Sequence, residues 1–451
     1  MQGHLSPNRR GRGLVSQLAR ARAMTDELFE VVRPAALYER PIAERHRIAF
    51  YIGHLEAFDW NLVGKYVLGI NSFHEGFDRL FAFGIDPLGG GLPADQPSDW
   101  PRIAEIREYN ARVRSALDAA LEKVLFDDSR QPLLRDGYVL NVALEHRLMH
   151  AETLAYMFHQ LPLDEKVPGP AAPTPEAPAV EPRMVEIPAG TTTLGLARTE
   201  NGYFGWDNEY DAHTADVPAF AIGAYKVTNR QWLEFMTAGG YDEARYWSPS
   251  DWEWKRQHNI SHPVFWQRRG DQWFCRTMFS EIPLPDEWPV YVSHAEASAY
   301  ARWAGKALPT EAQWHRAAFG TPGPHELNRG EGPERQYPWG DEHPGPSRGN
   351  FDFCHWDPTP AGAFPAGASA YGVMDLVGNG WEWTSTPFAP FPGFRAFPFY
   401  PGYSANFFDG KHHVMKGGSA RTAATLLRRS FRNWFQGHYQ YVYAGFRCVE
   451  N

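Results

Sequence analysis

The sequence predicts a multidomain protein in which an all-α four-helix bundle is followed by an α+β domain that is rich in loops. Its 451 residues exceed what one ordinary core accommodates. A proline-rich stretch at residues 164–182 separates two regions, and repeated proline favours an extended, semi-rigid linker. Helical spacing of apolar residues before this stretch gives way to short strand-like pieces after it. We therefore predict domains at residues 1–163 and 183–451.

The first domain is predicted to contain four helices, because apolar residues recur there at intervals of three and four positions. The stretches concerned are residues 14–32, 42–67, 100–126 and 133–161. Residues 84–91, which contain four glycines, predict a loop between the second and third helices. An antiparallel bundle of this kind commonly builds metal sites from its inward-facing side chains.

The second domain is predicted to mix short strands with a few helices. Glycine, proline, asparagine and aspartate interrupt its apolar runs, which is typical of loops. The stretches concerned are residues 184–187 and 191–194 for strands, and 229–238 and 295–304 for helices. Thr310 with Gln313 is a candidate capping box, which would begin another short helix.

The composition favours a cytoplasmic protein without nucleic-acid or membrane partners. The 44 basic and 53 acidic side chains give a net charge of −9, whereas nucleic-acid binding normally requires a basic face. The sequence has no apolar run of about 18 residues, the length that a membrane-spanning helix needs. Arg9 and Arg10 are followed by no apolar segment, so we do not expect export. Three widely spaced cysteines, Cys275, Cys354 and Cys448, indicate a reducing compartment.

Three histidines form a candidate metal site. His146 and His150 are four residues apart, so a helix places both imidazoles on one face. This spacing is weak evidence by itself, because two histidines satisfied within a core fit it equally well. His54 adds weight, since it lies within an apolar helix where a buried imidazole needs a partner. Three neutral imidazoles suit iron, zinc or copper, so the residues alone leave the metal open.

Three neighbouring residues are less favoured as metal ligands. Glu152 lies two positions after His150 and faces elsewhere on the helix, so we expect it to hold a neighbouring side chain. The sequences around His46 and His74 are typical of solvated helix ends.

Several motifs of the second domain, together with the three histidines, resemble the ergothioneine-type sulfoxide synthases. That family joins a DinB-like four-helix bundle to a domain like the formylglycine-generating enzyme, which has a C-type-lectin-like fold. The motifs occupy residues 227–229, 300–306, 308–311, 375–384, 416–419 and 445–447. Most of them belong to the scaffold, so they indicate the fold more than the substrate.

The resemblance implies a mononuclear nonheme iron oxidoreductase. In the family, three histidines that match His54, His146 and His150 bind iron(II), and the enzyme uses O2 to couple a thiol to the imidazole of hercynine, which is Nα-trimethylhistidine. The resemblance also implies an active site between the two domains, with Asn433 and Trp434 near the substrate. Formylglycine-generating enzymes have copper-binding cysteines just after the motif at 416–419, and this chain has none there.

Four residues depart from the family pattern at substrate positions. Met149 stands where ergothioneine enzymes typically have glutamine, and a nonpolar residue is more similar to the ovothiol type. Phe435 and Tyr439 replace the acidic and basic residues that bind γ-glutamylcysteine, which removes charge-assisted hydrogen bonds. Phe388 replaces a tyrosine that donates a proton. We therefore expect a less charged chalcogen donor.

Our main hypothesis is selenoneine synthesis, in which a carbon–selenium bond joins hercynine to a selenosugar. Phe435, His438 and Tyr439 would supply flat rings and hydrogen bonds to a neutral sugar. The catalytic proton donor is unknown, and the candidates are Tyr400, Tyr403, Tyr441 and Tyr443.

Several alternatives stay open. One is carbon–sulfur bond formation with cysteine, γ-glutamylcysteine or another thiol, on hercynine or on histidine. Another is a thiol dioxygenase, in which oxygen ends on the sulfur. A third is a noncatalytic ligand-binding protein, because this second-domain fold also has binding relatives.

Overall fold

The computed structural model describes residues 6–82, 92–127, 131–169, 174–198, 204–322 and 334–450. The chain divides into two compact units, Met1–Pro170 with Glu200–Phe204 and Ala171–Thr199 with Gly205–Asn451. We call them the helical unit and the α+β unit. The predicted multidomain fold is thereby confirmed, whereas the exact linker bounds of 164–182 stay a prediction. The loop predicted at 84–91 lies outside the described residues.

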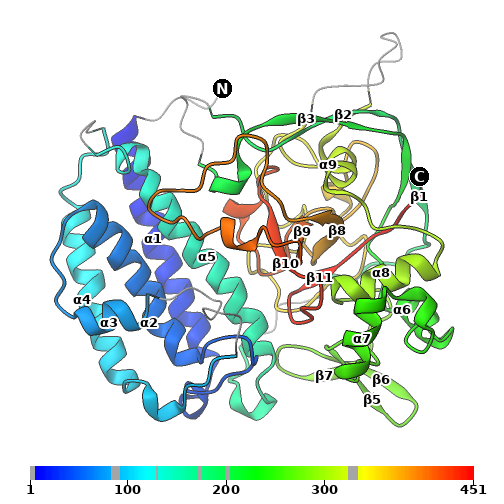
Figure 1. Ribbon diagram of the computed structural model, residues 1–451, viewed down its shortest axis with the longest axis horizontal. Helices are drawn as coiled ribbons and strands as arrows, with labels where there is room; N and C mark the ends of the chain where they lie inside the picture. The colour runs from blue at the N-terminus through cyan, green and yellow to red at the C-terminus, as the bar shows by residue number, and fades with distance from the viewer. Residues whose placement is uncertain are drawn as a thin grey trace. The chain divides into compact units, whose positions relative to one another are not determined.

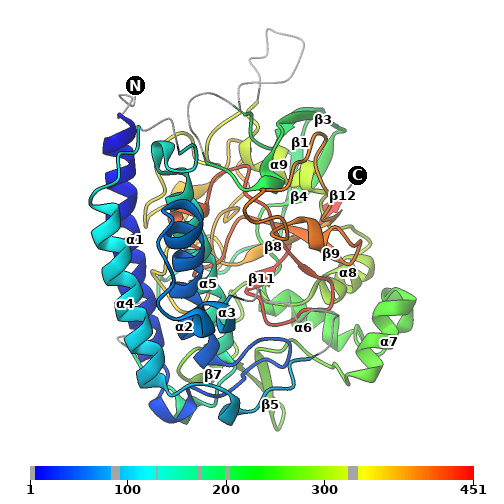
Figure 2. The ribbon, with the colours of Figure 1, turned by 60° about the vertical axis from the view of Figure 1, so that its left-hand side comes forward.

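The helical unit contains long helices that run side by side (Figures 1 and 2). Its α-helices are α1 (Pro7–Glu30), α2 (Ile48–Asp59), α3 (Glu75–Leu80), α4 (Ile103–Leu121) and α5 (Tyr138–His159). A π-helix, η2 (Trp60–Val67), continues α2 without a break, and short 3₁₀ turns include η4 (Arg135–Gly137). All four predicted helices are present. α1 begins earlier than predicted, because the Ser6 hydroxyl accepts from the Arg9 amide and Pro7 occupies the first turn.

The core of the helical unit surrounds α5, which is buried almost all round. α1 packs along α5, and α2 packs along α4. The buried side chains of α4 are Ile106, Tyr109, Val113, Leu117 and Leu121, whose spacing gives one apolar stripe. α5 has no such stripe, because apolar residues continue around its whole circumference. A helix of this type places any polar side chain it carries, including its histidines, inside the protein.

The α+β unit is built from small sheets with short helices. Its strands are β1 (Met184–Ile187), β2 (Gly190–Leu194), β3 (His213–Val217), β4 (Phe220–Gly223), β5 (Trp266–Arg269), β6 (Gln272–Arg276), β7 (Glu281–Pro283), β8 (Trp381–Pro387), β9 (His412–Lys416), β10 (Asn433–Gln436), β11 (Ala444–Gly445) and β12 (Val449–Glu450). Its α-helices are α6 (Asn229–Thr237), α7 (Pro249–Gln257), α8 (His294–Trp303) and α9 (Glu311–Phe319). The predicted capping box of Thr310 and Gln313 is confirmed at the start of α9.

Two of these sheets organise the unit. β1, β4 and β12 form one sheet in the order β1-β4-β12, whose apolar face packs against α9 through Ile187, Ile222 and Trp314. β10, β9, β8 and β11 form the other in that order (Figure 1). Within it, Trp434 of β10 is paired with Val414 of β9. The predicted substrate residues 433–435 therefore lie on the outer strand of this second sheet.

A buried ion cluster joins two of the motifs that carry the family resemblance, at residues 375–384 and 445–447. The Glu382 carboxylate accepts from Arg447 at 2.6 and 2.8 Å, and from the Trp314 indole at 3.0 Å. The Lys226 ammonium lies 3.1 Å from Glu382 and donates to the Gly378 carbonyl at 3.1 Å. These two motifs therefore contribute buried side chains to the interior of the α+β unit, which is typical of scaffold residues.

Among the helices of the described residues, none combines the length and apolar character needed to cross a bilayer. Cys275, Cys354 and Cys448 are all free thiols, and two of them are buried.

Candidate metal centre

Three buried histidines of the helical unit converge on one point. α2 supplies His54, and α5 supplies His146 and His150. One ligand atom from each lies within 4.8 Å of the others, and His54 Nε2 is 3.2 Å from His150 Nε2. Across the described ranges, this is the one group of three or more such side chains close enough to share a metal ion.

Aromatic rings of α2 enclose the histidines. Phe50, His54 and Phe58 recur at four-residue spacing, so one face of α2 presents all three rings. The Phe50 ring stacks on His54 with centroids 4.8 Å apart, and the Phe58 ring stacks on His146 at 3.5 Å. These apolar rings keep water from the imidazoles, and each histidine is at most 4% exposed.

A backbone carbonyl fixes the orientation of His54. The Phe81 carbonyl lies 2.7 Å from His54 Nδ1, so this nitrogen must carry the hydrogen and donate it. The lone pair is then on Nε2, the atom that faces His150. A hydrogen bond of this kind to the far ring nitrogen is a usual feature of metal-binding histidines.

The imidazoles are uncharged at neutral pH. Burial lowers the pKa of His54 to about 4, although the bond to the Phe81 carbonyl acts in the opposite direction. Burial and the neighbouring imidazoles hold the pKa values of His146 and His150 well below the usual value. Neutral imidazoles are the form that binds metals.

The residues present therefore fit a transition-metal ion. Nδ1 of His146 and Nδ1 of His150 are buried without a hydrogen-bond partner in the described part of the chain, which is costly for a group that only packs. Three nitrogen ligands without a carboxylate suit iron, zinc or copper. A set of three also leaves coordination positions for other molecules.

We expect Gly53→Ala to disturb this centre. A Cβ at Gly53 would lie 2.6 Å from the Phe81 ring, so Phe81 would have to shift together with the carbonyl that holds His54. The affinity for Co²⁺ should fall by about 10- to 100-fold, the usual cost of losing an outer contact to a ligand. A spectroscopic Co²⁺ titration measures it. Gly13→Ala is the matched control, because a Cβ on that α1 glycine meets nothing within 4 Å. Equal affinities in both variants would contradict the role of Phe81.

The helical unit also contains the other candidate residues. Met149 is half-buried on α5, and Glu152 is 6% exposed on the same helix. His46 packs against Phe50 with centroids 4.2 Å apart and ring planes tilted by 32°. His74 caps α3, where its ring nitrogen accepts from the Phe77 amide.

In the α+β unit, the structure brings several of the predicted substrate residues together. Phe388 and Trp434 stack with their ring planes 5° apart and centroids 4.2 Å apart. The ring centroids of Tyr403 and Phe407 lie 5.4 and 5.6 Å from that of Trp434. We call these four residues the Trp434 cluster. The Asn433 side chain accepts from the Trp434 amide at 2.9 Å, so it is held beside the cluster.

A second aromatic group includes the other substrate candidates. Phe435 stacks on Tyr439 with ring centroids 5.1 Å apart. The ring of Tyr441 packs edge-on against Tyr439, with centroids 5.4 Å apart. His438 is placed differently, because its Nε2 lies 2.8 Å from Asp251 and its ring stacks on Trp254. Asp251 and Trp254 come from α7 and were not among the predicted residues.

The four candidate tyrosines differ in environment. Tyr400 lies 5.5 Å from Tyr403, and burial, with a contribution from Asp207, raises its pKa to about 12. Tyr443 is 2% exposed and packs between Phe265 and Tyr291, which is typical of a core residue.

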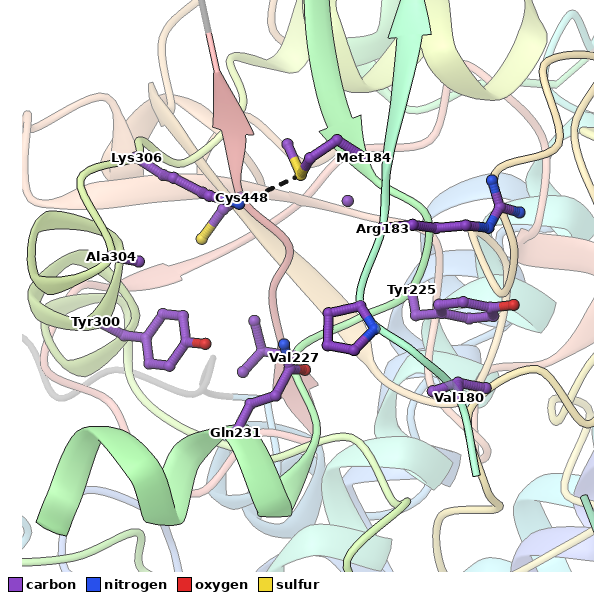
Figure 3. A pocket seen from close by; sticks show the side chains of 12 residues that line it. Val180, Arg183, Met184, Tyr225, Val227, Gln231, Tyr300, Ala304, Lys306 and Cys448 are labelled. Atoms are coloured by element: carbon purple, nitrogen blue, oxygen red, sulfur yellow. Dashed lines mark hydrogen bonds between the residues drawn. The ribbon is translucent and has the colours of Figure 1, made fainter. Parts of the chain in front are cut away.

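The α+β unit also has a small cavity of about 160 Å³ (Figure 3). Arg183, Tyr225, Lys306 and Cys448 are among its lining residues, and Lys306 donates to the Met184 sulfur at 3.4 Å. Its walls contain none of the residues predicted to bind substrate, and we assign it no function.

Comparison with known proteins identifies both domains. The family model described as "DinB superfamily" matches residues 17–154, and the "Sulfatase-modifying factor enzyme 1-like domain" matches residues 170–451. The solved structure of PvdO from Pseudomonas aeruginosa has 18% identity and a TM-score of 0.36, covering 59% of this chain and 94% of that chain.

Individual relatives match across both domains. A "Hercynine oxygenase" of Mycolicibacterium smegmatis is 37% identical, with 79% of each chain covered. The "Hercynine oxygenase" of Mycobacterium tuberculosis is 38% identical to this chain, with 77% of each chain covered. An "Ergothioneine biosynthesis protein 1" of Neurospora crassa is 28% identical, covering 92% of this chain and 55% of that protein. With relatives matched at this identity over most of their length, and both domain models in order, the chain belongs to the hercynine oxygenase family.

Proposed function

We propose that this protein is an iron(II)- and O2-dependent hercynine oxygenase that joins a small thiol to the imidazole of hercynine. The observation that carries the proposal is the buried group of His54, His146 and His150, in a chain 37% identical to a protein named for that activity. One thiol, one imidazole C–H and one O2 give a sulfoxide and one water. The S–H and C–H bonds break, a C–S bond forms, and O2 accepts the four electrons.

The helical unit is proposed to hold the iron. His54, His146 and His150 would be its protein ligands, and bound iron(II) would supply the redox chemistry that O2 requires. Phe50 and Phe58 would exclude water from the ligands. The Phe81 carbonyl would keep His54 in the tautomer that presents Nε2.

The α+β unit is proposed to recognise hercynine. Trp434 and the rings around it would hold the quaternary ammonium group of hercynine, because aromatic rings attract such a group by cation–π interaction. Asn433 supplies an amide next to those rings. The proposal also assigns the proton transfer to one of Tyr400, Tyr403 and Tyr441, because Tyr443 is more deeply buried, at 2% exposed against 9% for Tyr403.

An aerobic assay with purified, iron-loaded protein tests the activity. Hercynine and cysteine are supplied together, and the products are separated and identified by mass spectrometry. The proposal expects an adduct whose mass equals that of both substrates plus one oxygen and minus two hydrogens. Oxidised thiol without an adduct would instead identify a thiol dioxygenase.

A second candidate donor is a selenosugar, and the pairing of Phe435 with Tyr439 favours it. These side chains stack at the two positions where relatives of the mycobacterial type are expected to bind carboxylates. A doubly charged peptide would leave its carboxylates without partners there, which is costly. Flat rings are suited to a neutral sugar. The carbon–selenium reaction would be the selenium counterpart of the reaction above.

We expect a competition assay to rank the donors by charge. γ-Glutamylcysteine should give the least product, because the chain lacks the charged pair that would bind its carboxylates. The predicted disadvantage in kcat/KM against the preferred donor is about 100-fold, since two or more charge-assisted hydrogen bonds of roughly 1.5 kcal/mol are missing. Mass spectrometry of mixtures with hercynine, cysteine and selenosugar measures it. A preference for γ-glutamylcysteine would contradict our interpretation of Phe435 and Tyr439.

A further inference from the structure

A buried network of charges crosses the long helices of the helical unit, close to the histidines but on other helix faces. α1 contributes Arg22, α2 contributes Glu56 and Asp59, α4 contributes Arg114, and α5 contributes Arg147. Glu56 and Asp59 have side chains that are 1% exposed. Charges this deeply buried are costly unless each finds a partner in good geometry, so their positions are tightly constrained.

Arg147 is the residue of this network that connects α5 to α2. Its Nη2 donates to Asp59 at 2.8 Å and to the Leu55 carbonyl at 3.0 Å, and lies 3.0 Å from Glu56. Its Nη1 donates to the Thr25 hydroxyl of α1 at 3.2 Å. One planar guanidinium therefore bonds to two other helices at once, which a lysine with its single nitrogen cannot reproduce.

These contacts lie directly beside the metal centre in the chain. Arg147 follows His146, and Leu55 follows His54. The hydrogen bond between Arg147 and the Leu55 carbonyl therefore ties α5 to α2 at the level where the two helices present their histidines. A metal centre whose ligands come from two helices needs those helices fixed to within about 0.5 Å.

We propose that Arg147 is a positioning residue that sets the register of α2 against α5 and thereby the affinity of the metal centre. This inference rests on the proposed function in one respect, because it takes His54, His146 and His150 as the ligands. Arg147 contacts neither substrate nor metal in this account. It acts through the Leu55 carbonyl and the two carboxylates of α2.

Arg114 provides a matched comparison within the same network. It donates to Glu56 at 2.7 and 3.0 Å and to Asp26 at 2.6 and 2.8 Å. It therefore ties α4 to α2 and α1, and it makes none of these bonds to α5. Arg114→Met removes an arginine from the same carboxylate but leaves the bond between α5 and Leu55 in place.

The experiment compares full-length Arg147→Met with Arg114→Met. Each metal-free protein is titrated with Co²⁺, whose absorption bands report coordination geometry, and anaerobically with Fe²⁺. Stability is measured in parallel by urea unfolding. We expect Arg147→Met to weaken binding by about 10- to 100-fold and to shift the Co²⁺ bands, with Arg114→Met within roughly 3-fold of the unmodified protein.

If Arg147→Met does not fold, Arg147→Lys replaces it in the experiment. Lysine keeps the buried positive charge, but its single nitrogen cannot make the bonds that Nη1 and Nη2 make to two helices. This variant should also weaken Co²⁺ binding and shift the bands. Unchanged affinity in the Arg147 variants would overturn the inference. So would equal weakening in the Arg114 and Arg147 variants, because that would show a structural role alone. Failure of the unmodified protein to bind either ion would instead overturn the proposed function, and the inference with it.

Discussion

His150→Ala should abolish both metal binding and oxidative turnover. Removing this imidazole leaves two of the three nitrogen ligands, and a methyl group cannot replace the nitrogen that lies 3.2 Å from His54 Nε2. The loss of affinity should exceed the roughly 10- to 100-fold that changes around a ligand cost. Iron content after loading, measured by elemental analysis, and product formation from hercynine with a thiol test both effects. The overall fold should persist, because the variant leaves no buried charge without a partner.

His74→Ala is the control for this variant. His74 lies in the same unit and caps α3 through the Phe77 amide, so its loss should cost about 1 kcal/mol of stability and no iron. Full turnover by His150→Ala would exclude the three-histidine group as the reaction centre. If the unmodified protein bound hercynine without any turnover, and His150→Ala bound it equally, the chain would be a noncatalytic binding protein.

The long helices could be predicted from the sequence, because apolar residues that keep helical spacing over several turns do not fit a strand or a loop. The sequence also indicated the three histidines that the structure brings together, whose role as metal ligands stays a prediction. Four-residue spacing places His146 and His150 on one face of α5, and His54 stands out in an apolar helix. The short strands β5 to β7 and the helix α7 were missed, because short polar segments have no clear period.

The surroundings of the site were harder to predict. The acceptor for His54 is the backbone carbonyl of Phe81, and every residue has such a carbonyl, so the sequence carries no signal for it. Asp251, the partner of His438, lies 187 positions away in the chain. Phe50 and Phe58 flank His54 at four-residue spacing in the sequence. Their contact with the histidines depends on how α2 faces α5, which spacing within one helix does not determine.

Glu382→Leu should destabilise the α+β unit severely. Burial alone would raise the pKa of Glu382, but Arg447 and Lys226 hold it below its usual value, so the side chain is a carboxylate. Leucine would remove the carboxylate that Arg447 and Lys226 share, and both cations would stay buried without this partner. Arg447 and Glu382 are each fully buried. Removing one partner of such a cluster costs about 3–5 kcal/mol. That is a large fraction of the roughly 5–15 kcal/mol by which a typical protein is stable.

Urea unfolding followed by tryptophan fluorescence measures this loss in the relevant unit, because all of the 17 tryptophans except Trp60 and Trp100 belong to the α+β unit. Asp271→Asn is the control, since it breaks the exposed contact with Arg268 and should change stability by no more than about 1 kcal/mol. A similarly small effect of Glu382→Leu would show that Lys226 and Arg447 are satisfied by the backbone carbonyls around them. In that case the carboxylate would be dispensable, and packing rather than charge would hold these motifs together.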